Sequence, residues 1–184
     1  MRRLQAAAVL KRLPRSGWLM MGVVQAESVA EHSFATATLA LALTDAVNHD
    51  PVGQGLERTL DAGLVAQIAL VHDLAESAVT DLPHKATRYL GKEVKYRAEE
   101  RALQDLVGGL GSERLLTMWH AYANADGPEA RLVRDADKLE MVHQALVYEL
   151  AGQHTLEEFW QGHEWHYPVS ALLFAELLAR RPRR

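Results

Sequence analysis

Apolar residues recur along most of the chain with the three-to-four-residue spacing of amphipathic helices, and no convincing stretch alternates apolar and polar residues as a strand would. Residues 15–27 and 79–91 are predicted to be irregular, because glycines and a proline interrupt them. The sequence therefore predicts an all-α fold, a single-domain bundle of about seven or eight helices. The predicted helices are residues 3–13, 28–48, 57–77, 92–108, 112–124, 128–151, 155–161 and 168–180.

Two local signals fix helix starts. Ser28 and Glu31 have the spacing of a capping box, so a helix is expected to begin at Ser28. Pro128 is expected in the first turn of the long helix over 128–151. The helix over 28–48 is apolar or small nearly all round, which indicates a buried helix.

Composition narrows the class of protein. The chain has 184 residues, 48% of them hydrophobic, and a net charge of −4, which fits one globular domain and gives no basic surface for nucleic acid. The short basic tail at residues 181–184 is not expected to change this. No apolar run is expected to reach membrane-spanning length, and the absence of cysteine fits a cytoplasmic protein.

Polar side chains interrupt the apolar segments in three places. His32 lies in "HSFAT", His72 and Asp73 lie in "LVHDLAE", and Asp137 lies in "VRDADKLEM". An unpaired buried carboxylate costs several kcal/mol, so partners are required, and one metal ion can serve several carboxylates and imidazoles. Taken singly, each residue also fits a hydrogen-bonded core pair or a surface charge.

The order H…HD…D on helices of an all-α chain resembles the HD-domain metal-dependent phosphohydrolases. The stretches "LKRLPRSGW", "ESVAEHSF", "LVHDLAE", "TDLP" and "LVRDADKLEMVHQALVYE" resemble, in order, segments of the 5′-deoxynucleotidase branch, the YfbR-like and HDDC2-like proteins. The resemblance covers about residues 9–150 of a single HD domain spanning 1–184. The C-terminal helices over 155–180 add little to it.

The resemblance implies one divalent metal ion per chain. Its ligands would be His32, His72, Asp73 and Asp137. Two nitrogens and several carboxylate oxygens suit manganese, cobalt, iron, zinc or magnesium, and the sequence does not choose among them. Two-metal HD phosphodiesterases carry extra histidines between the second and last ligands. His84 and His120 lie in this interval, but their surroundings do not match those motifs, which favours one metal.

The resemblance also implies residues for catalysis and substrate binding, each with a plainer alternative. Glu76 and Asp81 would be catalytic carboxylates, or else a salt-bridge partner and a helix cap. Arg15 and Trp18 would contact substrate, or else be a solvated loop residue and a core residue. The remaining candidates are Lys85 and Lys92 as neighbours of a phosphate, or else surface lysines, and Glu140 and His143 as core-facing supports near Asp137.

One position departs from the family pattern, since many relatives have glycine where Thr80 stands. The function implied by the resemblance is that of an enzyme, a homodimeric phosphomonoesterase. It would remove the 5′-phosphate from (deoxy)nucleoside monophosphates by attack of a metal-bound water. Two alternatives stay open. One is another HD phosphohydrolase, acting on phosphodiesters or nucleotide alarmones, and the other is a catalytically silent HD binding module. The sequence does not fix the preferred base or the strictness of selection for a deoxy sugar.

Overall fold

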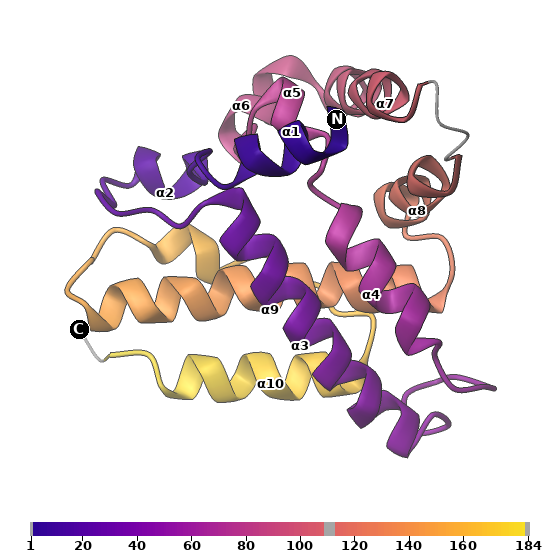
Figure 1. The fold of residues 1–184 in the computed structure, drawn as a ribbon. Coiled ribbons are helices and arrows are strands. Elements are labelled where there is room, and N and C mark those ends of the chain that lie inside the picture. Colours follow the sequence, from indigo (N-terminus) through magenta and orange to yellow (C-terminus); the bar gives the residue numbers. More distant parts are fainter. Residues whose placement is uncertain (1, 109–112, 183–184) are drawn as a thin grey trace.

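The computed structural model describes residues 2–108 and 113–182, and within these ranges the chain forms helices and no strand (Figure 1). This confirms the predicted all-α fold. In these ranges seven α-helices have nine residues or more, so the prediction of seven or eight helices matches the longer helices and omits the short ones. The elements are α1 Arg2–Leu10, α2 Ser16–Met20, α3 Val29–His49, α4 Ala62–Val71, α5 Glu76–Val79, α6 His84–Leu90, α7 Lys92–Val107, α8 Glu113–Asn124, α9 Pro128–Leu150, the 3₁₀ helix η1 Glu157–Trp160 and α10 Pro168–Ala179.

The main core lies where α3 crosses α9, with α4 packed against both and α10 against α9 (Figure 1). Fully buried aliphatic side chains such as Val47, Val65 and Leu139 fill it. The predicted capping box is present at the start of α3. The Ser28 hydroxyl accepts a hydrogen bond from the Glu31 N–H at 3.2 Å, and the Glu31 carboxylate accepts one from the Ser28 N–H at 2.7 Å.

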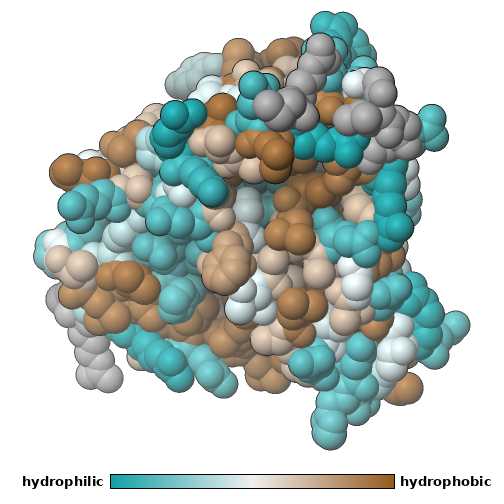
Figure 2. All heavy atoms as spheres, viewed as in Figure 1, coloured by the Kyte–Doolittle hydropathy of each residue, from teal (hydrophilic) through white to brown (hydrophobic). Residues whose placement is uncertain are grey.

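A smaller apolar cluster joins the short α5 to α7 and α8. Its buried members are Ala75, Ala102, Leu103 and Trp119. In Figure 1 these three helices lie together beyond one end of α4. Figure 2 shows that apolar side chains reach this face of the molecule in several groups among hydrophilic ones.

The predicted helix over 57–77 is wrong in its bounds and its continuity. Regular helix begins at Ala62 and ends at Val71, and a turn separates α4 from α5. The His72 ring Nδ1 donates to the Ala69 carbonyl at 2.6 Å, which occupies an acceptor that the next helical N–H would need. Tight bonds such as the one from the Glu76 N–H to the Asp73 carbonyl follow. His72 and Asp73 therefore stand at a helix break.

The two segments predicted to be irregular contain the short helices α2 and α6. A bridge between Pro14 and Ser28 closes the α2 segment at its base. The predicted helix over 3–13 ends at Leu10, and that over 155–161 is a 3₁₀ helix over four residues. The other helices match their predicted bounds within two residues. The predicted start at Ser112 and the end of the basic tail lie outside the described residues.

The expectation that no apolar run reaches membrane-spanning length was wrong. The stretch Ala62–Val79 is long and apolar enough, by length and composition, to cross a membrane, with a mean hydropathy of 1.3. The same test is passed by core helices of soluble proteins. In the structure the stretch breaks after Val71, and its members Val65 and Ile68 are buried in the main core.

Candidate active site

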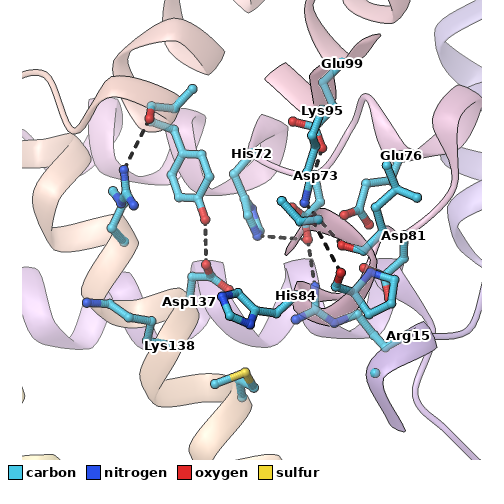
Figure 3. A pocket seen from close by; sticks show the side chains of 18 of the residues that line it. Arg15, His72, Asp73, Glu76, Asp81, His84, Lys95, Glu99, Asp137 and Lys138 are labelled. Atoms are coloured by element: carbon cyan, nitrogen blue, oxygen red, sulfur yellow. Dashed lines mark hydrogen bonds and ion pairs between the residues drawn. The ribbon is translucent and has the colours of Figure 1, made fainter. Parts of the chain in front are cut away.

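A cavity of about 460 Å³ opens where the main core meets the smaller cluster. Its lining residues come from α2, from the turn between α4 and α5, from the loop before α6, and from α6, α7, α8 and α9. The sequence-predicted residues Arg15, His72, Asp73, Glu76 and Asp137 all line it. Figure 3 shows their side chains converging from opposite walls.

Two buried histidines present the same ring nitrogen to one point. His32, from α3, uses Nδ1 to contact Glu140 Oε2 at 2.5 Å, and His72 uses Nδ1 to contact the Ala69 carbonyl at 2.6 Å. Their Nε2 atoms lie 3.4 Å apart. When both rings are neutral and donate from Nδ1, their Nε2 lone pairs face each other, an arrangement that a cation between them would satisfy.

Two aspartates face the same point. Asp137 Oδ1 lies 3.1 Å from His32 Nε2, and Asp73 Oδ2 lies 3.2 Å from His72 Nε2 and 3.6 Å from His32 Nε2. Ligand atoms of His32, His72 and Asp137 all lie within 4.8 Å of one another. The structure thus brings the four predicted ligands together. Two imidazole nitrogens and two carboxylates fit a divalent cation of intermediate hardness.

Charge in this cluster is strongly coupled. Burial favours the neutral form of Asp73 and Asp137, yet the histidines and Arg15 hold the pKa of both carboxyls below the usual range. Burial and Arg15 lower the pKa of His32, but Asp137 and Glu140 outweigh them and raise it to about 9. The carboxylates therefore stay ionised and attract positive charge, which is the condition for binding a cation.

Glu76 lies beside the cluster with an unusual environment. Its side chain is buried, and its Oε2 atom has no hydrogen-bond partner among the residues the structure describes. Burial, together with Asp73 and Asp81, raises the pKa of Glu76 to about 10. A carboxyl that favours its protonated form so strongly can hold a proton at neutral pH, while a nearby cation would favour its release.

Asp81 connects the cavity floor to α2. Its carboxylate accepts a hydrogen bond from the Ser16 N–H, and its backbone carbonyl accepts one from the Ser16 hydroxyl at 2.8 Å. This holds the neighbouring Arg15 over the cluster, where its Nη1 lies 3.1 Å from Asp73 Oδ2. Arg15 is half-buried, with 16% of its side chain exposed and its guanidinium paired with Asp73, so the solvated-loop alternative is wrong. Burial by itself would lower the pKa of the Arg15 guanidinium, but four surrounding carboxyl groups outweigh burial and raise this pKa above its usual value.

Comparison with known proteins identifies the family of this chain. A model of the HD domain family matches residues 7–167. The chain belongs to the HD domain family. It is 35% identical over 182 residues to the 5′-deoxynucleotidase HDDC2 of Danio rerio, covering 95% of this chain and 84% of the relative. It is 35% identical over 172 residues to the 5′-deoxynucleotidase hdd1 of Schizosaccharomyces pombe, covering 87% and 79%.

A solved structure is similar to this chain over nearly its whole length. A conserved hypothetical protein from Pyrococcus furiosus is 37% identical, with a TM-score of 0.78 over 97% of each chain. HD domains bind divalent metal, and the histidine–aspartate cluster described above is the part of this HD domain that could hold it.

The other predicted site residues of the HD domain lie in different settings. Trp18 lines the cavity but is 1% exposed, packs on Phe159 with ring centroids 4.2 Å apart, and donates from Nε1 to Glu27 at 2.9 Å. It is a core residue that also forms a cavity wall. His120 pairs with Glu100 at 2.8 Å, away from the cluster, and the exposed His84 lies at the cavity edge.

The lysines at the cavity were only partly foreseen. Lys85 is exposed and lies 3.8 Å from Glu158, and it is not among the described residues that line the cavity, whereas Lys92 is. Sequence reasoning missed Lys95 on α7, which lines the cavity 3.5 Å from Glu99. The pKa of Lys95 is raised because Glu99 and the site carboxylates outweigh its burial. The only signal in the sequence is the spacing of Lys95 one helical turn before Glu99.

Supporting residues of the HD domain were also only partly foreseen. Glu140 is buried and orients His32, as a core-facing support should. His143 is exposed, so its predicted place in the core was wrong: the turn after Glu140 carries it past the edge of the buried face of α9. Tyr122 was missed. Its hydroxyl donates to Asp137 Oδ2 at 2.5 Å.

Proposed function

We propose that this protein is a metal-dependent phosphomonoesterase that removes the 5′-phosphate from deoxynucleoside monophosphates. The observation that carries the proposal is the cluster of His32, His72, Asp73 and Asp137 at the base of a cavity that is also lined by the half-buried Arg15. The relatives named 5′-deoxynucleotidase support the substrate class. One divalent ion per chain is part of the proposal.

Each group at the cavity has a chemical task in this reaction. A bound divalent cation supplies Lewis acidity, which neutralises phosphate charge and acidifies water. Arg15 already uses Nη1 toward Asp73, and its other N–H groups remain to grip phosphate oxygens. Lys95 and Lys92 add positive charge at the cavity wall, which offsets the repulsion between a phosphate and the site carboxylates.

Proton transfer falls to the two remaining carboxyl groups. Glu76 is buried next to Asp73 and can hold a proton for the leaving alkoxide. Asp81 accepts a backbone hydrogen bond and keeps the α2 segment against the cavity, so it orients both the attacking water and Arg15. The cavity volume of about 460 Å³ falls in the range of small-molecule sites.

A substrate panel tests the proposal. Protein loaded with Mn²⁺ or Co²⁺ is assayed for phosphate release from 5′ and 3′ monophosphates, deoxy and ribo, together with triphosphates, cyclic dinucleotides and alarmones. We expect release from 5′-deoxynucleoside monophosphates and poor use of triphosphates. Hydrolysis of diesters or alarmones without monophosphatase activity would replace the proposal with another HD hydrolase. Bound metal with no turnover on any substrate would indicate a silent binding module.

We also propose that the protein is a homodimer. The α10 helix is apolar nearly all round, a composition typical of buried helices, yet Leu172 is 66% and Leu178 is 46% exposed. A second copy of the chain would cover this surface. Light scattering after size exclusion should give twice the chain mass, and Leu172→Glu should shift the protein toward monomer. A wild-type monomer at all concentrations would contradict the proposal.

A further inference from the structure

Tyr122 contacts two of the four proposed metal ligands, Asp137 and His72, but is not itself a proposed ligand. Its hydroxyl donates to Asp137 Oδ2 at 2.5 Å, and its ring packs edge-on against His72 with centroids 5.1 Å apart. It extends from α8, whereas Asp137 lies on α9 and His72 follows α4. One side chain therefore links three segments at the centre.

The geometry divides the Asp137 carboxylate between two tasks. Oδ2 accepts the Tyr122 hydrogen bond, while Oδ1 lies 3.1 Å from His32 Nε2, on the side of the cluster. A hydroxyl-to-carboxylate bond this short is a strong, charge-assisted contact that fixes the rotation of the carboxylate. Without it, rotation of Asp137 would carry Oδ1 away from the point that the histidines share.

The surroundings leave Tyr122 little freedom. The Arg134 guanidinium lies over its ring, 6.0 Å from the centroid, and the His72 ring contacts its edge. Tyr122 also lines both the main cavity and a second cavity of about 390 Å³, and Asp137 lines both as well. Its ring thus forms part of the wall beside the cluster as well as holding a ligand.

We propose that Tyr122 is a positioning residue for the metal centre, which sets the metal affinity by fixing Asp137 through its hydroxyl and His72 through its ring. This inference rests on the metal site in the proposed function but not on the substrate. Removing a hydrogen-bond partner of a metal ligand commonly lowers metal affinity about ten- to a hundredfold, and we expect that range for Tyr122→Phe.

The test compares two matched Tyr→Phe variants. Tyr167 is buried and its hydroxyl donates to the Pro128 carbonyl at 2.8 Å, so Tyr167→Phe removes a similar bond to the same long helix, α9, away from the site. Binding of Mn²⁺ and Co²⁺ to the metal-free protein is measured by calorimetry, and the Co²⁺ absorption spectrum reports a change in coordination. Thermal melts of the metal-free proteins report folding.

Tyr122→Phe should weaken metal binding about ten- to a hundredfold and alter the Co²⁺ spectrum, while Tyr167→Phe leaves both unchanged. Tyr122→Leu, which also removes the ring from His72, should weaken binding further. Unchanged affinity in Tyr122→Phe, or an equal loss in Tyr167→Phe, would overturn the inference, as would a metal-free melt that falls far more for Tyr122→Phe.

The result also separates this inference from the proposed function. If wild-type protein binds metal but hydrolyses no nucleotide, and Tyr122→Phe still weakens binding, the positioning role stands and the substrate assignment fails. If wild-type protein hydrolyses monophosphates and Tyr122→Phe binds metal normally, only the positioning role fails. A wild-type protein that binds neither Mn²⁺ nor Co²⁺ would overturn both.

Discussion

The two walls of the cavity are built in different ways. On one side, Asp137 comes from the middle of the long helix α9, and the buried His32 behind it comes from the first turn of the long helix α3, which crosses α9 in the main core. On the other wall, Arg15 and Asp81 come from short segments around α2 and α5 that are joined by side-chain-to-backbone hydrogen bonds. The long-helix wall is rigid because its backbone bonds are buried with the core.

This difference assigns different tasks to the two walls. A metal ligand must be held within a few tenths of an ångström, which the packed helices provide for His32 and Asp137, while the turn after α4 holds His72 and Asp73. Groups that meet a substrate must admit and release it, which suits segments tied by a few hydrogen bonds at the surface. Changes on the long-helix wall should therefore affect metal binding, and changes on the short-segment wall should affect turnover.

The largest effect is expected for loss of a ligand. His32→Ala removes a nitrogen from the centre of the cluster, so metal affinity should fall by more than about a hundredfold, beyond the loss typical of an indirect partner. The stabilisation of the protein by added metal should disappear from thermal melts. His120→Ala is the control, because His120 pairs with Glu100 outside the cluster. Full metal binding in His32→Ala would refute the ligand assignment.

The second effect separates chemistry from binding. Glu76→Gln and Asp81→Asn should each keep metal bound but lower kcat about a hundred- to ten-thousandfold, because each loses a carboxyl that moves or orients a proton. Elemental analysis and steady-state kinetics on the same preparations check this. Near wild-type rates in both variants would make these carboxyls structural and would remove the distinction between the two walls.

The third effect concerns Arg15. Its planar fork suits two parallel bonds to phosphate, so Arg15→Lys should lower kcat/KM about ten- to a hundredfold without weakening metal binding. Arg15→Ala should bind metal as well as wild type or better, since a positive charge has left the site. It should also destabilise the metal-free protein, because Asp73 loses its 3.1 Å partner.

The matched control is Arg97→Lys, an exposed arginine that pairs with Glu93 one turn earlier on α7. Its kinetics and melting temperature should not change. If Arg15→Lys behaves like Arg97→Lys, then Arg15 does not contact substrate. Weaker metal binding in Arg15→Ala would show that this side chain supports the cluster itself, contrary to the division between the walls.

The same division explains how far the sequence could predict the molecule. His32 and Asp137 lie on long helices whose periodicity and caps can be recognised in the sequence. The structure brings these two residues together with the other two predicted ligands, His72 and Asp73. Such patterns carry no information on side-chain hydrogen bonds between distant segments. The burial of Arg15 depends on Asp81, sixty-six positions away, and the Tyr122 contact depends on how α8 meets α9.

The break after Val71 shows a local limit of the same kind. The pattern of "LVAQIALVHDLAES" continues as a helix, and only the contact of the His72 ring with the Ala69 carbonyl reveals why regular helix ends there. Lys85 and Lys95 show the limit of composition. Either lysine could be a phosphate neighbour by sequence, and only the packing of α7 against α5 places Lys95 at the cavity.

The smallest effect concerns Thr80, the position where many relatives carry glycine. Its backbone has φ 68° and ψ 163°, a region that residues with a Cβ rarely adopt, and it directly precedes Asp81. Such a conformation costs about 1–3 kcal/mol, while a glycine gives back about 0.5–1 kcal/mol through its freer unfolded chain. Thr80→Gly should therefore raise the stability by about 0.5–2 kcal/mol, a few degrees in melting temperature.

Thr117→Gly, on the exposed face of α8, makes the same replacement at an ordinary helical backbone and should give no gain. Because Ser16 still fixes Asp81, kcat/KM of Thr80→Gly should stay near that of wild type. A gain in stability with a large loss of kcat would show that the strained backbone at Thr80 itself helps to place Asp81. A loss of stability would show that the backbone at Thr80 stores no strain in the short-segment wall.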